Sequence, residues 1–228
     1  MLGGMGGAMG EREQNGGMPD NAFAEGGAPT MGDENCLIQV NGGYTVLDAA
    51  GDAVDSNGSV EVTGGVLLVN GPMSGGDGAF DYDLTATVTG GTALMVGSTG
   101  MAQNFTSGEQ PFAFITASGN AGDSVAVANA DGTVVASLMA AKQFGMVLVS
   151  SPAFEEGGSY SLVIGGQVSG ANADGYADVG TVSGGTTAEI TASTTASGGM
   201  GGLGMGGGGM PAGQGGDIQR GMRGGALQ

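Results

Sequence analysis

The chain repeats one short motif, a glycine pair followed by an apolar stretch: "NGGYTVL" at 41–47, "TGGVLLV" at 63–69 and "TGGTALMV" at 89–96. The second copy follows the first by 22 residues, and the third follows the second by 26. A period in the low twenties with a glycine turn and short strands is typical of a β-solenoid, in which successive coils stack in parallel. Periodic glycine alone does not fix strand direction, so an antiparallel meander is the open alternative.

The composition suits a thin core. Of 228 residues, 53 are glycine and none is tryptophan or histidine, so the apolar positions fall mostly to Ala, Val and Met. The 22 acidic and 4 basic residues give a formal net charge of −18. Nucleic-acid binding requires a basic surface, which so few basic residues do not provide. An anionic membrane surface would repel the chain for the same reason. With Cys36 as the single cysteine, we expect neither an internal disulfide nor a cysteine metal cluster.

The sequence divides into four segments. Residues 1–35 and 191–228 are Gly/Met-rich, low-complexity stretches that we expect to be disordered. Residues 36–110 hold the repeats and predict about three coils of a parallel β-helix. Residues 111–190 lose the period; there "NADG" at 129–132 separates two apolar stretches as in a β-hairpin, which predicts a small antiparallel β cap on the solenoid. The stretch "VASLMAAKQFG" at 135–145 fits either a short helix or a strand and turn. No run of 18 apolar residues occurs, so no membrane span is expected.

Two acidic turns accompany the repeats, "GDAVDSNGSV" at 51–60 and "GDGAFDYDLT" at 76–85. Aligned on Gly-Asp, Asp52 falls on Asp77; with Gly78 as a one-residue insertion, Asp55 falls on Asp81 and Asn57 on Asp83. Coils stack about 4.8 Å apart, where two carboxylates repel by roughly 3.5 kcal/mol at an effective dielectric of 20. A calcium ion, which prefers oxygen ligands, would turn this repulsion between the coils into a net attraction. The alternative is that these are ordinary Asx turns in water. We predict Ca²⁺ ligands at Asp52, Asp55, Asn57, Asp77, Asp81 and Asp83.

Longer strings carry a resemblance to a known family. They are "GDAVDSNGSVEVTGGVLLVNGP" at 51–72, "GDGAFDYDLTATVTGG" at 76–91 and "AAKQFGMVLVSSPAFEEGGSYSLVIGG" at 140–166. Residues 36 to about 170 resemble the clostridial family of calcium-bearing parallel β-helix carbohydrate-binding domains, which look like pectate lyases in fold but bind cellulose and pectic polysaccharide. The resemblance implies a right-handed parallel β-helix, calcium in the acidic turns, and secretion to the cell surface. The family has more coils before this point and a signal peptide, so we expect this chain to be a fragment of a longer precursor.

The function expected from these features is that of a non-catalytic carbohydrate-binding module. Uronate elimination needs a base, commonly Arg or Lys, and none occurs between residues 13 and 141, so we expect no lyase and no enzyme. Lys142 follows the repeats, where a structural contact is expected. Phe80 is expected to point inward, which leaves Tyr82 and Tyr44 as predicted sugar platforms. Pectic polyuronate would require calcium bridges to this anionic surface. The alternative function is a structural surface or matrix protein that self-associates by β-helix stacking.

Overall fold

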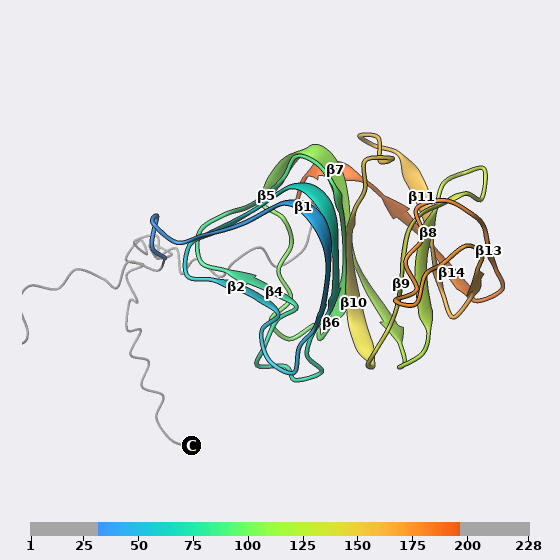
Figure 1. The fold of residues 1–228 in the computed structure, drawn as a ribbon, viewed down its shortest axis with the longest axis horizontal. Helices are drawn as coiled ribbons and strands as arrows, with labels where there is room; N and C mark the ends of the chain where they lie inside the picture. The colour runs from blue at the N-terminus through green and yellow to red at the C-terminus, as the bar shows by residue number, and fades with distance from the viewer. Residues whose placement is uncertain (1–31, 197–228) are drawn as a thin grey trace, which may run out of the picture.

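The computed structural model describes residues 32–196, and the regular structure in that range is entirely β-strand (Figure 1). The strands are β1 (Leu37–Asp48), β2 (Val54–Ser56), β3 (Ser59–Asn70), β4 (Phe80–Tyr82), β5 (Ala86–Val88), β6 (Thr92–Gly97), β7 (Ser107–Gly119), β8 (Ser124–Ala128), β9 (Val134–Met139), β10 (Phe144–Ser150), β11 (Ser159–Ile164), β12 (Gln167–Val168), β13 (Val182–Ser183), β14 (Thr186–Thr191) and β15 (Ser193–Thr195). Within residues 32–196, no helix is long and apolar enough to cross a membrane.

The repeats form stacked parallel rungs, as the period predicts. The first rung is β1, the second is β3, and the third consists of β5 and β6 together. Ile38 lies beside Val60, and Val60 lies beside Ala86, so the register offsets of 22 and 26 residues match the spacing of the glycine pairs. The all-β class and the β-solenoid of roughly three turns are confirmed, and the antiparallel meander is excluded for these strands. The handedness stays a prediction.

Each rung bends at its glycine pair. Gly43, Gly65 and Gly91 have φ of 84°, 83° and 79°, in the left-handed region that side chains rarely adopt. A Cβ on Gly65 would lie 2.6 Å from the carbonyl carbon of Gly42, and a Cβ on Gly91 would lie 2.6 Å from that of Gly64. The motif recurs because the backbone of one rung passes directly against the bend of the next.

The opposite wall of the coils is a two-stranded parallel ladder of β2 and β4. It pairs Val54 with Phe80 and Ser56 with Tyr82. Inside the coils, Phe80 packs against Phe105 with ring centroids 5.1 Å apart, and Phe105 packs against Phe112 at 5.4 Å. These aromatic rings fill the interior together with small aliphatic side chains from every rung.

The parallel stack ends where an antiparallel strand joins the sheet. The start of β7 pairs in parallel with β5, but the place beside β6 is taken by β10, which runs antiparallel to both β6 and β7. Strand β15 also pairs with β7, so the prediction of a disordered tail from residue 191 is wrong for Ser193–Thr195. Residues 197–228, and residues 1–31 of the N-terminal segment, lie outside the described range.

The sheet that contains β3, β6 and β10 serves two cores. Leu67 and Val69 point into the coils, whereas Leu68 between them points into a second core on the other face. The same alternation occurs in β10, where Met146 and Leu148 face the coils and Val147 faces the second core. Strands buried on both faces are apolar at every position, which explains the unbroken runs "VLLV", "ALMV" and "MVLV".

The second core is closed by an antiparallel sheet of order β14-β11-β8-β9, seen to the right in Figure 1. Strands β8 and β9 are joined by the turn at 129–132, which confirms the predicted hairpin. Residues 134–139 are strand β9 and are followed by a turn, so the strand-and-turn reading of 135–145 is the correct one.

Candidate functional site

Three of the predicted cation ligands lie close together on the outside of the β2–β4 wall. Asp55 and Asp81 are register partners, as the alignment of the two acidic turns predicts. The Oδ1 of Asp52 accepts a hydrogen bond from the backbone N–H of Gly78 at 2.6 Å. The register is constant here, so Gly78 lies opposite Asp52 and is not an insertion; the predicted pairing of Asp52 with Asp77 is wrong by one residue.

Within residues 32–196, no Lys or Arg side chain pairs with Asp81. Its pKa is raised from the ordinary value, first by partial burial and then by the neighbouring carboxylates of Asp52, Asp55 and Asp83. Each of these causes disfavours the ionised form of Asp81. The wall therefore contains like charges whose repulsion works against the stacking of the coils.

Gln103 extends this column to the third rung. Its Nε2 donates to Oδ1 of Asp81 at 2.6 Å, while its Oε1 is buried with no hydrogen-bond partner. A half-turn of the amide would present Oε1 toward the carboxylates, adding a neutral oxygen of the kind that calcium accepts. Gln103 was missed from the sequence, although "MAQNF" follows the acidic turn at one further period.

These side chains fit a cation only after rotation. Within residues 32–196, no three Asp, Glu, Cys or His side chains converge closely enough to hold a metal ion as they stand. Asp52 and Asp55 are exposed, however, and Asp81 is half-buried, so the first two carboxylates are free to turn toward the third. The donor set that an ion would gather consists of Asp52, Asp55 and Asp81, with Gln103 as the amide oxygen.

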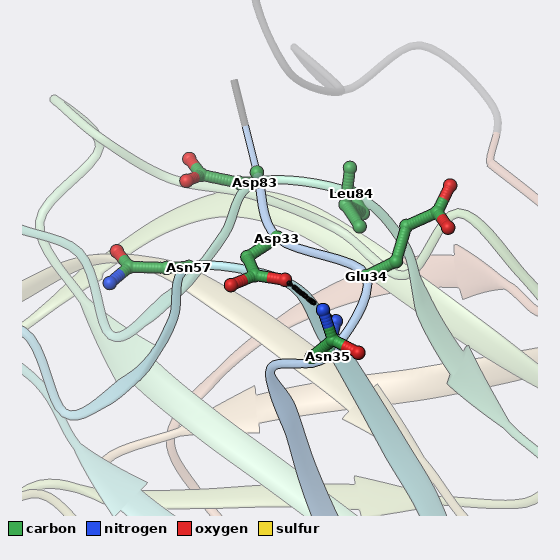
Figure 2. Close-up of a pocket in the computed structure, with 7 residues that line it drawn as sticks. Asp33, Glu34, Asn35, Asn57, Asp83 and Leu84 are labelled. Carbon is green, nitrogen blue, oxygen red and sulfur yellow. Dashed lines mark hydrogen bonds between the residues drawn. The ribbon is translucent and has the colours of Figure 1, made fainter. Parts of the chain in front are cut away.

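Asn57 and Asp83 form a second group at the corner of the coils (Figure 2). They point to the same side and line an open depression with Asp33, whose backbone N–H donates to the carbonyl of Asn57 at 2.6 Å. Asp33 lies in the segment that we assigned to low complexity, so the ordered fold begins before residue 36. The period could have revealed it, because Asp33 precedes Asn57 by 24 residues.

Asp77 stands apart from both groups. Its Oδ2 accepts a hydrogen bond from the hydroxyl of Ser74 at 2.6 Å, within the turn that precedes Gly78. This local contact is the kind that an acidic turn makes in water, without an ion. The six predicted ligands are thus divided among two groups and one separate turn.

The prediction of Tyr82 as a sugar platform is wrong. Its side chain is 6% exposed, its ring packs 5.3 Å from that of Phe80, and its hydroxyl donates to the backbone carbonyl of Asn104. Burial, with a smaller effect of Asp81, raises the pKa of Tyr82 to about 12, so the hydroxyl stays a donor. Positions 80 and 82 of one strand share a face, so an inward Phe80 implies an inward Tyr82.

Tyr44 is exposed and lies beside a second tyrosine. It is 45% exposed on β1, and its ring meets the edge of Tyr176 at a centroid distance of 5.7 Å. Its hydroxyl donates to Oδ2 of Asp174 at 3.0 Å and accepts from Nδ2 of Asn172 at 2.8 Å. We call these four residues the tyrosine patch. Asp174 and Asn172 belong to a second "NADG" turn, at residues 172–175.

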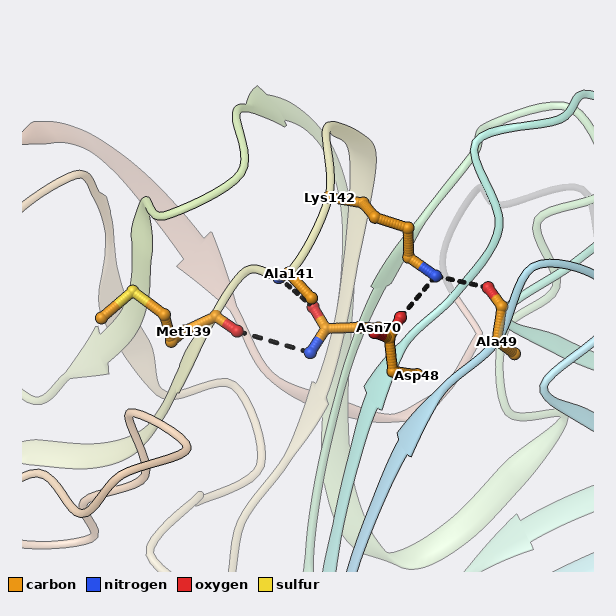
Figure 3. Close-up of polar contacts among 6 residues, drawn as sticks. All are labelled: Asp48, Ala49, Asn70, Met139, Ala141 and Lys142. Carbon is orange, nitrogen blue, oxygen red and sulfur yellow. Dashed lines mark hydrogen bonds and ion pairs between the residues drawn. The ribbon is translucent and has the colours of Figure 1, made fainter.

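The two halves of the fold are joined by polar contacts near the second core (Figure 3). Lys142 makes an ion pair with Asp48 at 2.6 Å and donates to the carbonyl of Ala49. Asn70, the register partner of Asp48, accepts from the N–H of Ala141 at 2.9 Å. Lys142 therefore has the structural contact expected of it.

Comparison of the chain with protein-family models, with curated proteins and with solved structures finds no match. The resemblance to calcium-bearing carbohydrate-binding domains accordingly stays a prediction. A proposal for the function can rest on the tyrosine patch and on the carboxylates of Asp52, Asp55 and Asp81.

Proposed function

We propose that this protein is a non-catalytic module that binds plant-type polysaccharide, cellulose or pectic polyuronate, through the tyrosine patch. The observation that carries the proposal is the exposed ring of Tyr44, which packs edge-to-face with Tyr176 and has carboxylate and amide groups at its hydroxyl. Sugar rings stack on such aromatic faces, and their hydroxyls bond to such polar groups. Asp174 and Asn172 can serve both donors and acceptors on a neutral glycan.

Calcium is the second part of the proposal. Burial, and then the neighbouring carboxylates, raise the pKa of Asp81; an ion held by Asp52, Asp55 and Asp81 would cancel the repulsion among the carboxylates. It would also let a uronate carboxylate approach an anionic surface, since one ion can bridge both carboxylates. Binding of polygalacturonate would then depend on calcium, whereas binding of cellulose through the tyrosine patch would not.

The test is retention of the purified full chain on cellulose and on polygalacturonate, with calcium and with EDTA. We expect Tyr44→Ala to reduce retention on cellulose at least tenfold, because about 1.4 kcal/mol of stacking is lost. Met73→Ala, which alters an exposed side chain on another surface, is the matched control. Equal retention of wild type and Tyr44→Ala on both glycans would refute binding through the tyrosine patch.

The calcium site has its own readout, the midpoint of thermal unfolding. With a dissociation constant of about 0.1 mM, calcium at 10 mM would stabilise the folded chain by roughly 2.7 kcal/mol. Asp81→Asn should abolish this shift, whereas Asp77→Asn should keep it. A wild-type midpoint that does not respond to calcium would remove the ion from the proposal and leave the tyrosine patch to be judged by cellulose retention.

Polymerisation by end-to-end stacking has less support. It needs an open strand edge at each end of the solenoid, but the edge of β6 is already paired with β10.

A further inference from the structure

The first rung has the form of an inner rung that lacks a neighbour. Among the described strands, β1 pairs only with β3. A Cβ on Gly42 or Gly43 would meet nothing within 4 Å, whereas the equivalent atom on Gly65 would strike the preceding rung. The inward residues Ile38, Val40 and Leu47 are half-buried, although their counterparts on β3 are fully buried.

The backbone groups that face the open edge of β1 follow from its hydrogen bonds to β3. The carbonyl of Cys36 accepts from Ser59, and the N–H of Ala49 donates to Asn70. Strand residues alternate in the side to which their N–H and C=O point. The register shifts at the glycine pair, so the alternation changes phase there. The residues that face the open edge are Leu37, Gln39 and Asn41 before the bend, and Tyr44, Val46 and Asp48 after it.

These positions are symmetric about the Gly42–Gly43 bond. A second copy turned by a twofold axis through that bond would run antiparallel and would bend at the same place. It would set Leu37 opposite Asp48, Gln39 opposite Val46 and Asn41 opposite Tyr44. All six are open-edge residues, so each pair can exchange both backbone hydrogen bonds. We propose that two copies of this chain pair through β1 in this register, which is self-complementary as a twofold interface requires.

The same rotation matches the side chains of the two open coils. Ile38 would lie opposite Leu47 of the second copy, and Val40 opposite Thr45; all four are the less exposed residues of β1. The half-buried apolar side chains of both copies would therefore close one another's interior. The outward side chains, with Tyr44 among them, would stay on the outer face, so the pairing does not depend on the proposed function.

Apart from its irregularity at the glycine pair, which a second copy would share, strand β1 lacks the features that protect exposed edges. Natural edge strands carry Lys, Pro or a charge that discourages pairing. This 12-residue strand has neither Lys nor Pro, and its one carboxylate, Asp48, is already paired with Lys142 of the same chain. The net charge of −18 opposes association at low salt, so pairing should tighten as salt is added. Since the far end of the solenoid is paired with β10, assembly through this edge stops at two copies.

A disulfide tests the register. In a Cys36→Ser background, Gln39→Cys with Val46→Cys places two thiols opposite each other across the axis, about 5.5 Å apart between Cα atoms, within disulfide reach. Leu37→Cys with Gln39→Cys is the matched control, because those positions do not meet. We expect mild oxidation of the full chain at tens of micromolar to yield a covalent dimer for the first pair only. Equal amounts of dimer from both pairs would overturn the register.

Light scattering tests the uncrosslinked protein. The wild-type full chain should have twice the mass of one chain. Val46→Pro, which removes an N–H on the open edge, should be monomeric with an unchanged circular dichroism spectrum, whereas Val46→Thr should remain dimeric. A monomeric wild type, a filament, or a folded Val46→Pro dimer would each overturn the proposal. So would a wild type that pairs only after residues 1–31 are deleted, because that segment would then occupy the edge.

Discussion

The first and second rungs have the same shape but different neighbours. Strands β1 and β3 both bend at a glycine pair, and before and after the bend their inward residues are register partners. Strand β3 is paired along both edges and its second half is covered on both faces, whereas β1, among the described strands, is paired along one edge. The motif therefore determines how a rung folds, and the position in the stack determines how much each residue contributes to stability. Substitutions at register partners measure that difference.

The largest difference is expected at the bend. Gly65→Ala should lower the free energy of unfolding by about 4 kcal/mol, because it combines a left-handed φ with a clash against the backbone of Gly42 and Gly43. Gly43→Ala has the same φ and an open Cβ site, so about 1–2 kcal/mol is expected. Chemical denaturation at the lowest workable concentration, where association contributes least, measures both. Equal losses would show that neighbouring rungs do not touch at the bend.

The next difference is expected in the second core. Leu68 is 1% exposed and its register partner on β1, Val46, is 39% exposed. Leu68→Ala should cost about 3 kcal/mol through the lost burial and the cavity left behind, and Val46→Ala less than about 1 kcal/mol. The same denaturation experiment applies. A small loss for Leu68→Ala would mean that the antiparallel sheet does not cover this face.

The register partners Asn70 and Asp48 allow the contribution of polar contacts in the two rungs to be compared. Asn70→Ala should cost about 1–3 kcal/mol, because Asn70 is buried and the N–H of Ala141 would lose its acceptor. Asp48→Ala removes a partly exposed ion pair with Lys142 and should cost at most about 1 kcal/mol. Adding salt should shrink the effect of Asp48→Ala and leave that of Asn70→Ala unchanged. The opposite salt response would contradict the assigned contacts.

The smallest effect is expected at Asp81, whose register partner is Asp55 and which we compare with a residue outside the wall. A carboxyl whose folded pKa is raised stabilises the fold at low pH, and that contribution is lost as pH rises through the raised pKa. Without calcium, Asp81→Asn should therefore raise the unfolding midpoint more at pH 7 than at pH 4. Asp131→Asn, in an exposed turn, is the control and should show no such trend. A larger rise of the unfolding midpoint at pH 4 than at pH 7 would contradict the raised pKa of Asp81.

The parallel rungs could be predicted because the sequence motifs that determine them are short and repeated. The spacing of the glycine pairs gives both register offsets, and the acidic turns give the pairing of Asp55 with Asp81. The strand alternation also places Tyr82 on the inward face of Phe80, which is incompatible with its prediction as a sugar platform. Asp33 was not predicted to belong to the ordered fold, because its turn lacks the glycine pair that marks the rungs.

The shared sheet could not be predicted in the same way. Strand β10 pairs with β6 across roughly 50 residues of sequence, and no repeat relates the two. An unbroken apolar run such as "VLLV" indicates burial on both faces without naming what covers them. The tyrosine patch has the same origin, since Tyr44 and Tyr176 come from distant segments that only the packing of the two halves brings together.

Backbone hydrogen exchange in the first two rungs tests the parallel stack most directly. At low protein concentration, we predict that β1 alternates, with slow exchange at Ile38, Val40, Thr45 and Leu47 and fast exchange at the open-edge residues, with the phase changing at the glycine pair. Strand β3 should be protected along its whole length. Uniformly fast exchange in β3, or an alternation in β1 that continues unchanged through Gly42 and Gly43, would contradict the stack of bent parallel rungs.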